Sequence, residues 1–82
     1  MGFAWKEWRS HDVFDQAKVT VQWKDRLLVG HIHRTGGFLQ CTIFNYQVVL
    51  GENILERYVE FPASTEDEAK RKIETVMLNI MH

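Results

Sequence analysis

The sequence predicts an α+β fold, an antiparallel meander of about four strands with one C-terminal helix packed across a face. Apolar residues recur with a period of two over most of residues 17–61 and with a helical period over residues 64–81. No strand–helix–strand alternation is present, so no crossover helix would make neighbouring strands parallel. Turn signals separate the apolar runs, as hairpin connections require.

Length and composition exclude several classes of protein. The chain has 82 residues, of which 45% are hydrophobic and 26% charged, and its net charge is −1. These values predict one small domain, residues 1–82, and exclude intrinsic disorder. No window approaches the roughly 18 uncharged apolar residues of a membrane span. Cys41 is the only cysteine, which excludes an internal disulfide.

Residues 1–16 have the least regular pattern. Residues 3–8 fit either a short edge strand or one helical turn that places Trp5 beside Trp8, and Ser10-His11-Asp12 is expected to break this element. No charged segment followed by an apolar one opens the chain, as a secretory signal would. Together with one free thiol, this predicts a cytoplasmic protein.

The first predicted hairpin spans residues 17–34. Residues 17–24 alternate between apolar and polar side chains, which predicts a strand with one solvated face. Lys24-Asp25 provides a tight turn into a second strand over residues 26–34, which is apolar on both faces. The core side of the first strand is predicted to contain Ala17, Val19, Val21 and Trp23.

A third strand is predicted over residues 38–46, after a turn at Gly36-Gly37, where glycine adopts positive φ at little cost. Residues 48–50 extend this strand past an irregularity near Asn45. Residues 38–50 carry no charge. A central position would simply bury this strand, whereas an edge position would allow a homodimer or pairing with a partner's strand.

The fourth strand is predicted over residues 54–61, between a turn at Gly51-Glu52-Asn53 and Pro62, which closes the strand. Its inward-facing side chains are predicted to be Leu55, Val59 and Phe61.

A helix is predicted from about residue 65 to residue 80. Thr65-x-x-Glu68 has the spacing of a capping box, and the acids at 66–68 complement the positive end of the helix. Three acids, Glu66, Asp67 and Glu68, each precede a base by four residues, and such ion pairs stabilise the solvent-facing side of a helix. The apolar stripe that faces the sheet consists of Ala69, Ile73, Val76, Met77 and Ile80.

His31-x-His33 is the strongest candidate for a metal-binding pair, because residues two apart share one face of a strand. A third ligand would have to come from His11, Asp12 or Cys41, and the spacing requires none of them. We therefore interpret the two histidines as polar residues on an exposed face and expect no metal site.

Catalytic and cofactor motifs are not found in the sequence. Cys41 alternates with Leu39 and Ile43, which indicates a small buried hydrophobe and not a nucleophile. Gly36-Gly37 lacks the helix and the Lys-Ser/Thr pair of a phosphate-binding loop. We expect a protein that is not an enzyme and that uses no cofactor.

Basic and aromatic residues concentrate in the first part of the chain. Residues 1–34 carry six cations against four anions, a balance of +2, whereas residues 35–82 carry four against seven, a balance of −3. Tryptophan and arginine dominate the energetics of protein interfaces. The predicted partner-binding surface consists of Trp5, Trp8, Arg9, Lys24, Arg26, His31, His33 and Arg34.

Two hypotheses for the function follow. The first is a non-enzymatic interaction module that modulates or inhibits a larger protein, and its compact, motif-free character resembles small accessory proteins of phages and mobile elements. The alternative is a nucleic-acid-binding module that uses the same residues as a stacking platform. The acids at 66–68 argue against a double-stranded-RNA binder, which needs lysines at the start of this helix.

Overall fold

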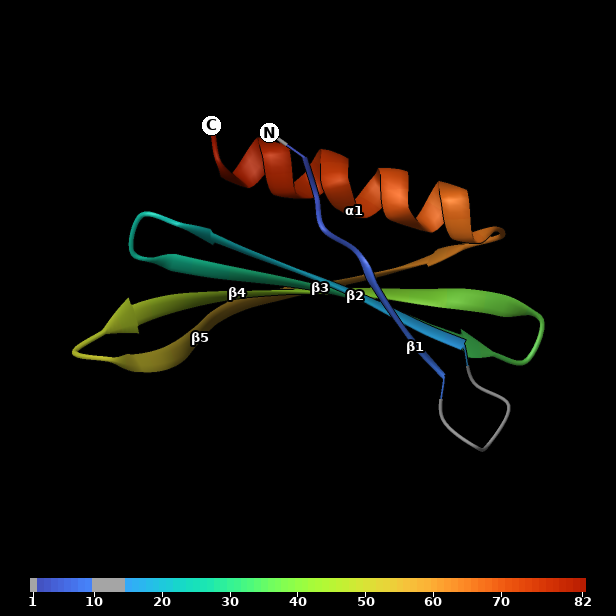
Figure 1. Ribbon diagram of the computed structural model, residues 1–82, viewed down its shortest axis with the longest axis horizontal. Coiled ribbons are helices and arrows are strands. Elements are labelled where there is room, and N and C mark those ends of the chain that lie inside the picture. Colours follow the sequence, from blue (N-terminus) through green and yellow to red (C-terminus); the bar gives the residue numbers. More distant parts are fainter. Residues whose placement is uncertain (1, 10–14) are drawn as a thin grey trace.

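The computed structural model describes residues 2–9 and 15–82. Five strands pair in chain order, each antiparallel to the next, and one helix lies across one face of the twisted sheet (Figure 1). The α+β meander with a C-terminal helix is thus confirmed, with five strands in place of about four. The elements are β1 (Lys6–Arg9), β2 (Asp15–Trp23), β3 (Arg26–Thr35), β4 (Phe38–Val49), β5 (Glu52–Ala63) and α1 (Glu66–Ile80).

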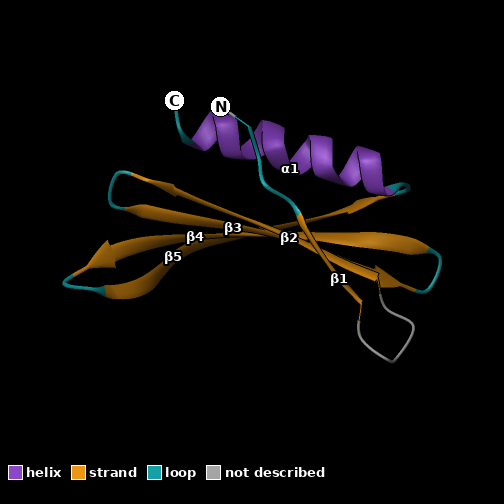
Figure 2. Cartoon of the chain, in the orientation of Figure 1, coloured by secondary structure: helices purple, strands orange, loops and turns teal. Residues whose placement is uncertain are grey.

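The additional strand is β1, which pairs with β2 at the edge of the sheet. Of the two alternatives for residues 3–8, the short edge strand is therefore correct. The predicted break at Ser10-His11-Asp12 lies outside the described residues. The segment before β1 rises from the sheet toward α1, as Figure 2 shows. In the described part of the chain, no helix is long and apolar enough to cross a membrane.

The core lies between the sheet and α1, and alternation along the strands builds it. We call the side of the sheet that α1 covers the helix face. Leu28, Ile32, Cys41 and Ile43 are almost completely buried there, as the alternating pattern predicts. The helix contributes its stripe at intervals of four residues, Ala69, Ile73 and Met77, each with no exposed surface.

Gly30 is the point where the helix approaches the sheet most closely. A Cβ atom at this position would lie 2.6 Å from Ile73 Cγ2 and 2.9 Å from Val19 Cγ1. Real carbon atoms cannot approach so closely without displacing a neighbour. The missing side chain on β3 therefore lets α1 settle against the middle of the sheet.

The start of α1 is capped as the sequence predicts. Thr65 is the N-cap, and its hydroxyl accepts a hydrogen bond from the Glu68 backbone N–H at 3.1 Å. The Glu68 carboxylate accepts in return from the backbone N–H of Ser64, at 3.3 Å. Two ion pairs run along the outer side, from Glu66 to Lys70 and from Glu68 to Lys72.

The β4–β5 hairpin differs from the prediction at its turn. The turn is Leu50-Gly51, both with positive φ (52° and 82°), and not Gly51-Glu52-Asn53. Positive φ at both central residues matches the twist of the flanking strands, and this geometry selects the position of the turn. Strand β5 continues through Pro62, which pairs with Gln40, because an edge strand tolerates a residue without an N–H.

An irregularity in the pairing of β4 with β5 overturns the inward assignment of Leu55. The irregularity expected near Asn45 is present, since Asn45 pairs with Arg57 and Tyr46 with Leu55, which leaves Glu56 as an extra residue. This bulge moves the following side chains to the other face. Leu55 is 52% exposed, whereas Val59 and Phe61, beyond the bulge, are partly buried on the helix face.

Trp23 is not part of the core, contrary to the prediction. It lies at the end of β2, partly buried, and is not among the residues that pack against the core cluster. The Lys24 ammonium lies 4.6 Å from the centre of its ring instead. The alternation in the sequence predicts to which face of the sheet a side chain projects. It does not predict whether the helix covers that part of the face.

Strand β4 is central, between β3 and β5. Its backbone is therefore paired on both sides, which excludes the edge pairing considered for residues 38–50. A homodimer through the side chains of this strand stays a prediction.

Gly30→Ala is expected to destabilise the fold by about 1–3 kcal/mol, because the new methyl group overpacks the contact with Ile73 and Val19. Urea unfolding curves of the two proteins measure this change. Gly37→Ala is the matched control, since a Cβ there meets no atom within 4 Å. Equal stability of Gly30→Ala and the parent protein would contradict the close approach.

Candidate interaction surface

The side of the sheet opposite α1 carries a candidate interaction surface. We call it the open face, because no described helix or loop covers it (Figure 2). Directly opposed residues in an antiparallel sheet project to the same side, so the strand registers define which residues share this face. Two groups of side chains occupy it, one apolar and one basic.

The apolar group occupies the half of the open face nearest the β2–β3 turn. Val29, Phe44 and Tyr58 oppose one another across β3, β4 and β5, and the next row holds Leu27, Tyr46 and Leu55. The ring of Phe44 stacks on those of Tyr46 and Tyr58, with centroids 6.0 and 5.9 Å apart. We call this set the apolar patch: Leu27, Val29, Phe44, Tyr46, Leu55 and Tyr58.

The basic group lies beside the apolar patch on β1, β2 and β3. Lys6 opposes Lys18, and Lys18 opposes His31. His33 follows on the same face, with its ring centroid 5.9 Å from that of His31. We call Lys6, Lys18, His31 and His33 the basic row. The same row continues to Glu60 at the β5 edge, which limits its positive potential.

Burial lowers the pKa of His31 below the usual range of a histidine, and the nearby charges of His33 and Lys18 lower it further. The imidazole is therefore neutral near pH 7 and can accept or donate one hydrogen bond.

The described residues offer the two histidines no third metal ligand, and the candidates His11 and Asp12 lie outside the described residues. Among the described side chains, no three from His, Cys, Asp and Glu gather in a group that holds a metal ion. Cys41 projects to the helix face and is fully buried. Burial raises the pKa of its thiol, which keeps it in the less nucleophilic form.

Trp5, predicted as a binding residue, packs against the helix. Its indole Nε1–H donates a hydrogen bond to Glu74 Oε2 at 2.8 Å, and the Lys70 ammonium lies 5.7 Å from the ring centre. The ring is partly buried against the core. Trp5 therefore attaches the N-terminal segment to α1, on the side away from the open face.

The other predicted binding residues do not form one continuous surface. Lys24 and Arg26 lie at the β2–β3 turn, whereas His33 and Arg34 lie at the opposite end of β3. Arg26 forms an ion pair with Glu56 of β5. The backbones of Trp8 and Arg9 pair with β2, and their side chains lie outside the described ones. Whether any of these residues binds a partner stays a prediction.

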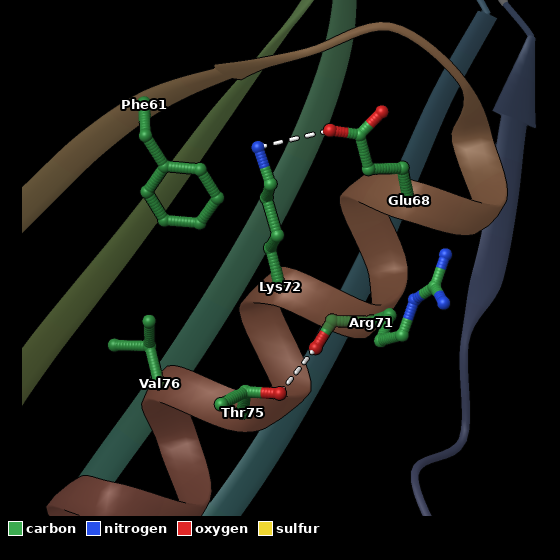
Figure 3. A pocket seen from close by; sticks show the side chains of 6 residues that line it. All are labelled: Phe61, Glu68, Arg71, Lys72, Thr75 and Val76. Carbon is green, nitrogen blue, oxygen red and sulfur yellow. Dashed lines mark hydrogen bonds and ion pairs between the residues drawn. The ribbon is translucent and has the colours of Figure 1, made fainter.

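A groove lies between α1 and β5 (Figure 3). This groove has a volume of about 510 Å³ and an apolar floor that includes Phe61 and Val76. Lys72 and Glu68 on its rim are 2.9 Å apart, and this hydrogen bond is the main cause that lowers the pKa of Glu68. Since these two charges neutralise each other, the groove presents mainly carbon surface.

The apolar patch was not identified from the sequence. The signal was present, because residues 26–34 and 38–46 are apolar on both faces while the chain supplies a single helix. One helix covers one face of a sheet, so apolar residues on the second face remain uncovered. Leu55 joins the patch only because of the bulge, which the sequence does not locate.

Comparisons of this chain with protein-family models, with curated proteins and with solved structures find no match.

Trp5→Phe is expected to lower the free energy of unfolding by about 1–3 kcal/mol, since the ring stays but the bond to the Glu74 carboxylate is lost. Urea unfolding measures the loss. In a Glu74→Gln background the same change should cost less, because the charged acceptor is already gone. An equal cost in both backgrounds would contradict this expectation, because it would show that the negative charge of Glu74 adds nothing to a hydrogen bond that the glutamine Oε1 can still accept.

The lowered pKa of His31 predicts that stability decreases in acid. The unfolded chain takes up a proton near its ordinary pKa of about 6.5, before the folded protein does, so unfolding becomes easier as the pH falls from about 7 through this range. His31→Gln should reduce this decrease in urea unfolding experiments, and the exposed His82→Gln should not. Identical pH profiles for all three proteins would contradict the prediction.

Proposed function

We propose that this protein is a non-enzymatic interaction module that acts in the cytoplasm and modulates or inhibits a larger protein by binding it through the open face. The observation that carries the proposal is the apolar patch. Leu55 and Tyr58 are 52% and 54% exposed, and the ring of Phe44 stacks on those of Tyr46 and Tyr58.

Three exposed large apolar side chains lie on the open face. In the described part of the chain, seven large apolar side chains are exposed, and of these Phe38, Leu55 and Tyr58 project to the open face. Val49 and Ile54 project to the helix face, Leu50 lies in the β4–β5 turn and Leu78 lies on α1. Contiguous exposed apolar surface on a small protein marks interaction sites. Aromatic residues at its centre supply the large contact area typical of residues that dominate binding.

The basic row beside the patch favours a second candidate, a single-stranded nucleic acid whose bases stack on Phe44, Tyr46 and Tyr58. Lys6 and Lys18 would then contact phosphates. A protein partner has more support, because the patch contains aliphatic Leu27, Val29 and Leu55, and because the net charge of the chain is −1. Nucleic-acid modules usually carry a basic excess.

Phe44→Lys tests the proposal, because it places a charge at the centre of the apolar patch. We expect capture of the partner from a lysate of the source cells to weaken at least about 30-fold, the effect of losing a dominant contact. Leu78→Lys is the matched control, since Leu78 is 47% exposed on α1 and lies away from the open face. Thermal melts of both variants establish that they are folded.

Nuclease treatment and salt distinguish the two candidates. A protein partner should survive nuclease and moderate salt, whereas nucleic-acid binding should fall steeply with salt as counterions are released. Equal capture by Phe44→Lys and the parent protein would overturn the open face as the binding surface. Loss of capture with nuclease would replace the protein partner with nucleic acid.

A further inference from the structure

The outer edge of β5 is long and has no covering element in the described part of the chain. β5 is the last strand in the sheet order and has twelve residues. All of its residues from Glu52 to Tyr58 are exposed, among them Ile54 and Leu55 at 50% and 52%. Natural proteins protect such edges with charged side chains, prolines, bulges or covering loops, because an exposed edge pairs with other strands. β5 has no lysine, and its one proline lies near its end. The charged residues at its bulge, Glu56 and Arg57, have opposite signs, so they need not repel a second copy of the same strand.

The sequence of β5 is complementary to itself in the antiparallel direction. If two copies of β5 lie antiparallel with a twofold axis between Glu56 and Arg57, then Glu56 of one copy is opposite Arg57 of the other. The neighbouring pairs are Leu55 with Tyr58 and Ile54 with Val59, so apolar residues meet apolar residues. A twofold axis repeats each of these pairs, as a symmetric interface between identical chains requires.

The bulge at Glu56 is what makes this pairing geometrically consistent. In a regular strand, Leu55 and Tyr58 would point to opposite faces, and opposed residues must share a face. Here Leu55 opposes Tyr46 and Tyr58 opposes Phe44, two residues apart on β4, so both project to the open face. Ile54 and Val59 oppose Gln47 and Ile43 and share the helix face in the same way.

The charged pair follows the same rule. Arg57 opposes Asn45 on the helix face, and Glu56 forms its ion pair with Arg26, which belongs to the helix face of β3. The bulge thus places two consecutive side chains of opposite charge on one side of an exposed edge. Without the bulge, Glu56 and Arg57 would project to opposite faces, and Glu56 of one copy could not meet Arg57 of the other.

From these observations we propose that a second copy of this chain pairs with β5 edge to edge, antiparallel, about a twofold axis between Glu56 and Arg57. The two sheets then form one ten-stranded sheet, with both helices on one side and the two apolar patches adjoining on the other. This inference does not depend on the proposed function, because the oligomeric state tests the pairing of the β5 edges, whereas partner capture tests the open face.

A charge-exchange experiment tests the pairing. At high protein concentration, light scattering after gel filtration should give the parent protein twice its chain mass of 9.7 kDa. Arg57→Glu and Glu56→Arg each place like charges opposite each other, so each alone should dissociate at least about tenfold more readily. A mixture of the two variants restores both opposite-charge pairs and should form a heterodimer.

Arg71→Glu is the matched control, because it changes the net charge equally at an exposed site on α1 and should leave the dimer intact. A monomeric parent protein would overturn the proposal, as would dimeric Arg57→Glu or a mixture that stays monomeric. These outcomes do not affect the test of the open face, which uses Phe44→Lys and measures partner capture.

Cysteine cross-linking gives a second test in case Glu56→Arg, which also loses its partner Arg26, fails to fold. Leu55→Cys mixed with Tyr58→Cys should form a disulfide, because opposed residues bring their Cβ atoms within about 5.5 Å. Leu55→Cys mixed with Gln22→Cys, an exposed residue of β2, should not. Equal cross-linking in both mixtures would refute the register.

Discussion

The contact between α1 and the sheet over Gly30 is the constraint on which the rest of the structure depends. Ile73 occupies the space that a side chain on β3 would fill, and Met77 and Val19 close around it. This close approach buries the helix stripe completely and fixes which side of each strand is the core. It also fixes the position of Glu74, which receives the hydrogen bond from Trp5 and so holds the N-terminal segment.

One helix on a sheet of five strands leaves a second face uncovered, and this imbalance produces the candidate interaction surface. In the half of the sheet nearest the β2–β3 turn, β3 and β4 carry apolar side chains on the open face as well as on the helix face. On the open face, Phe44, Tyr46 and Tyr58 shield one another by stacking but remain accessible. A partner protein that covers this face would complete a two-sided core, which is the physical basis of the proposed function.

The bulge at Glu56 connects the open face with the edge. It changes the face to which the residues of β5 before Arg57 project, so that Leu55 enlarges the apolar patch and Glu56 forms its ion pair with Arg26. Bulges are frequent at sheet edges, where they redirect side chains or end pairing. Here one extra residue changes both the composition of the open face and the pairing properties of the strand.

The sequence by itself determined the local features of this protein: the alternation that defines the strands, the capping of α1 by Thr65, the stripe of Ala69, Ile73 and Met77, and the burial of Cys41. These follow from periodicity and from hydrogen bonds between residues close in the chain. The tertiary structure alone decided that Leu55 is exposed, that Trp23 lies beyond the core, that Trp5 binds Glu74, and that the predicted binding residues separate onto different sides. Each of these depends on the register between strands and on the extent of the helix over the sheet. Register and coverage are set by packing between distant residues, about which the local pattern carries no information.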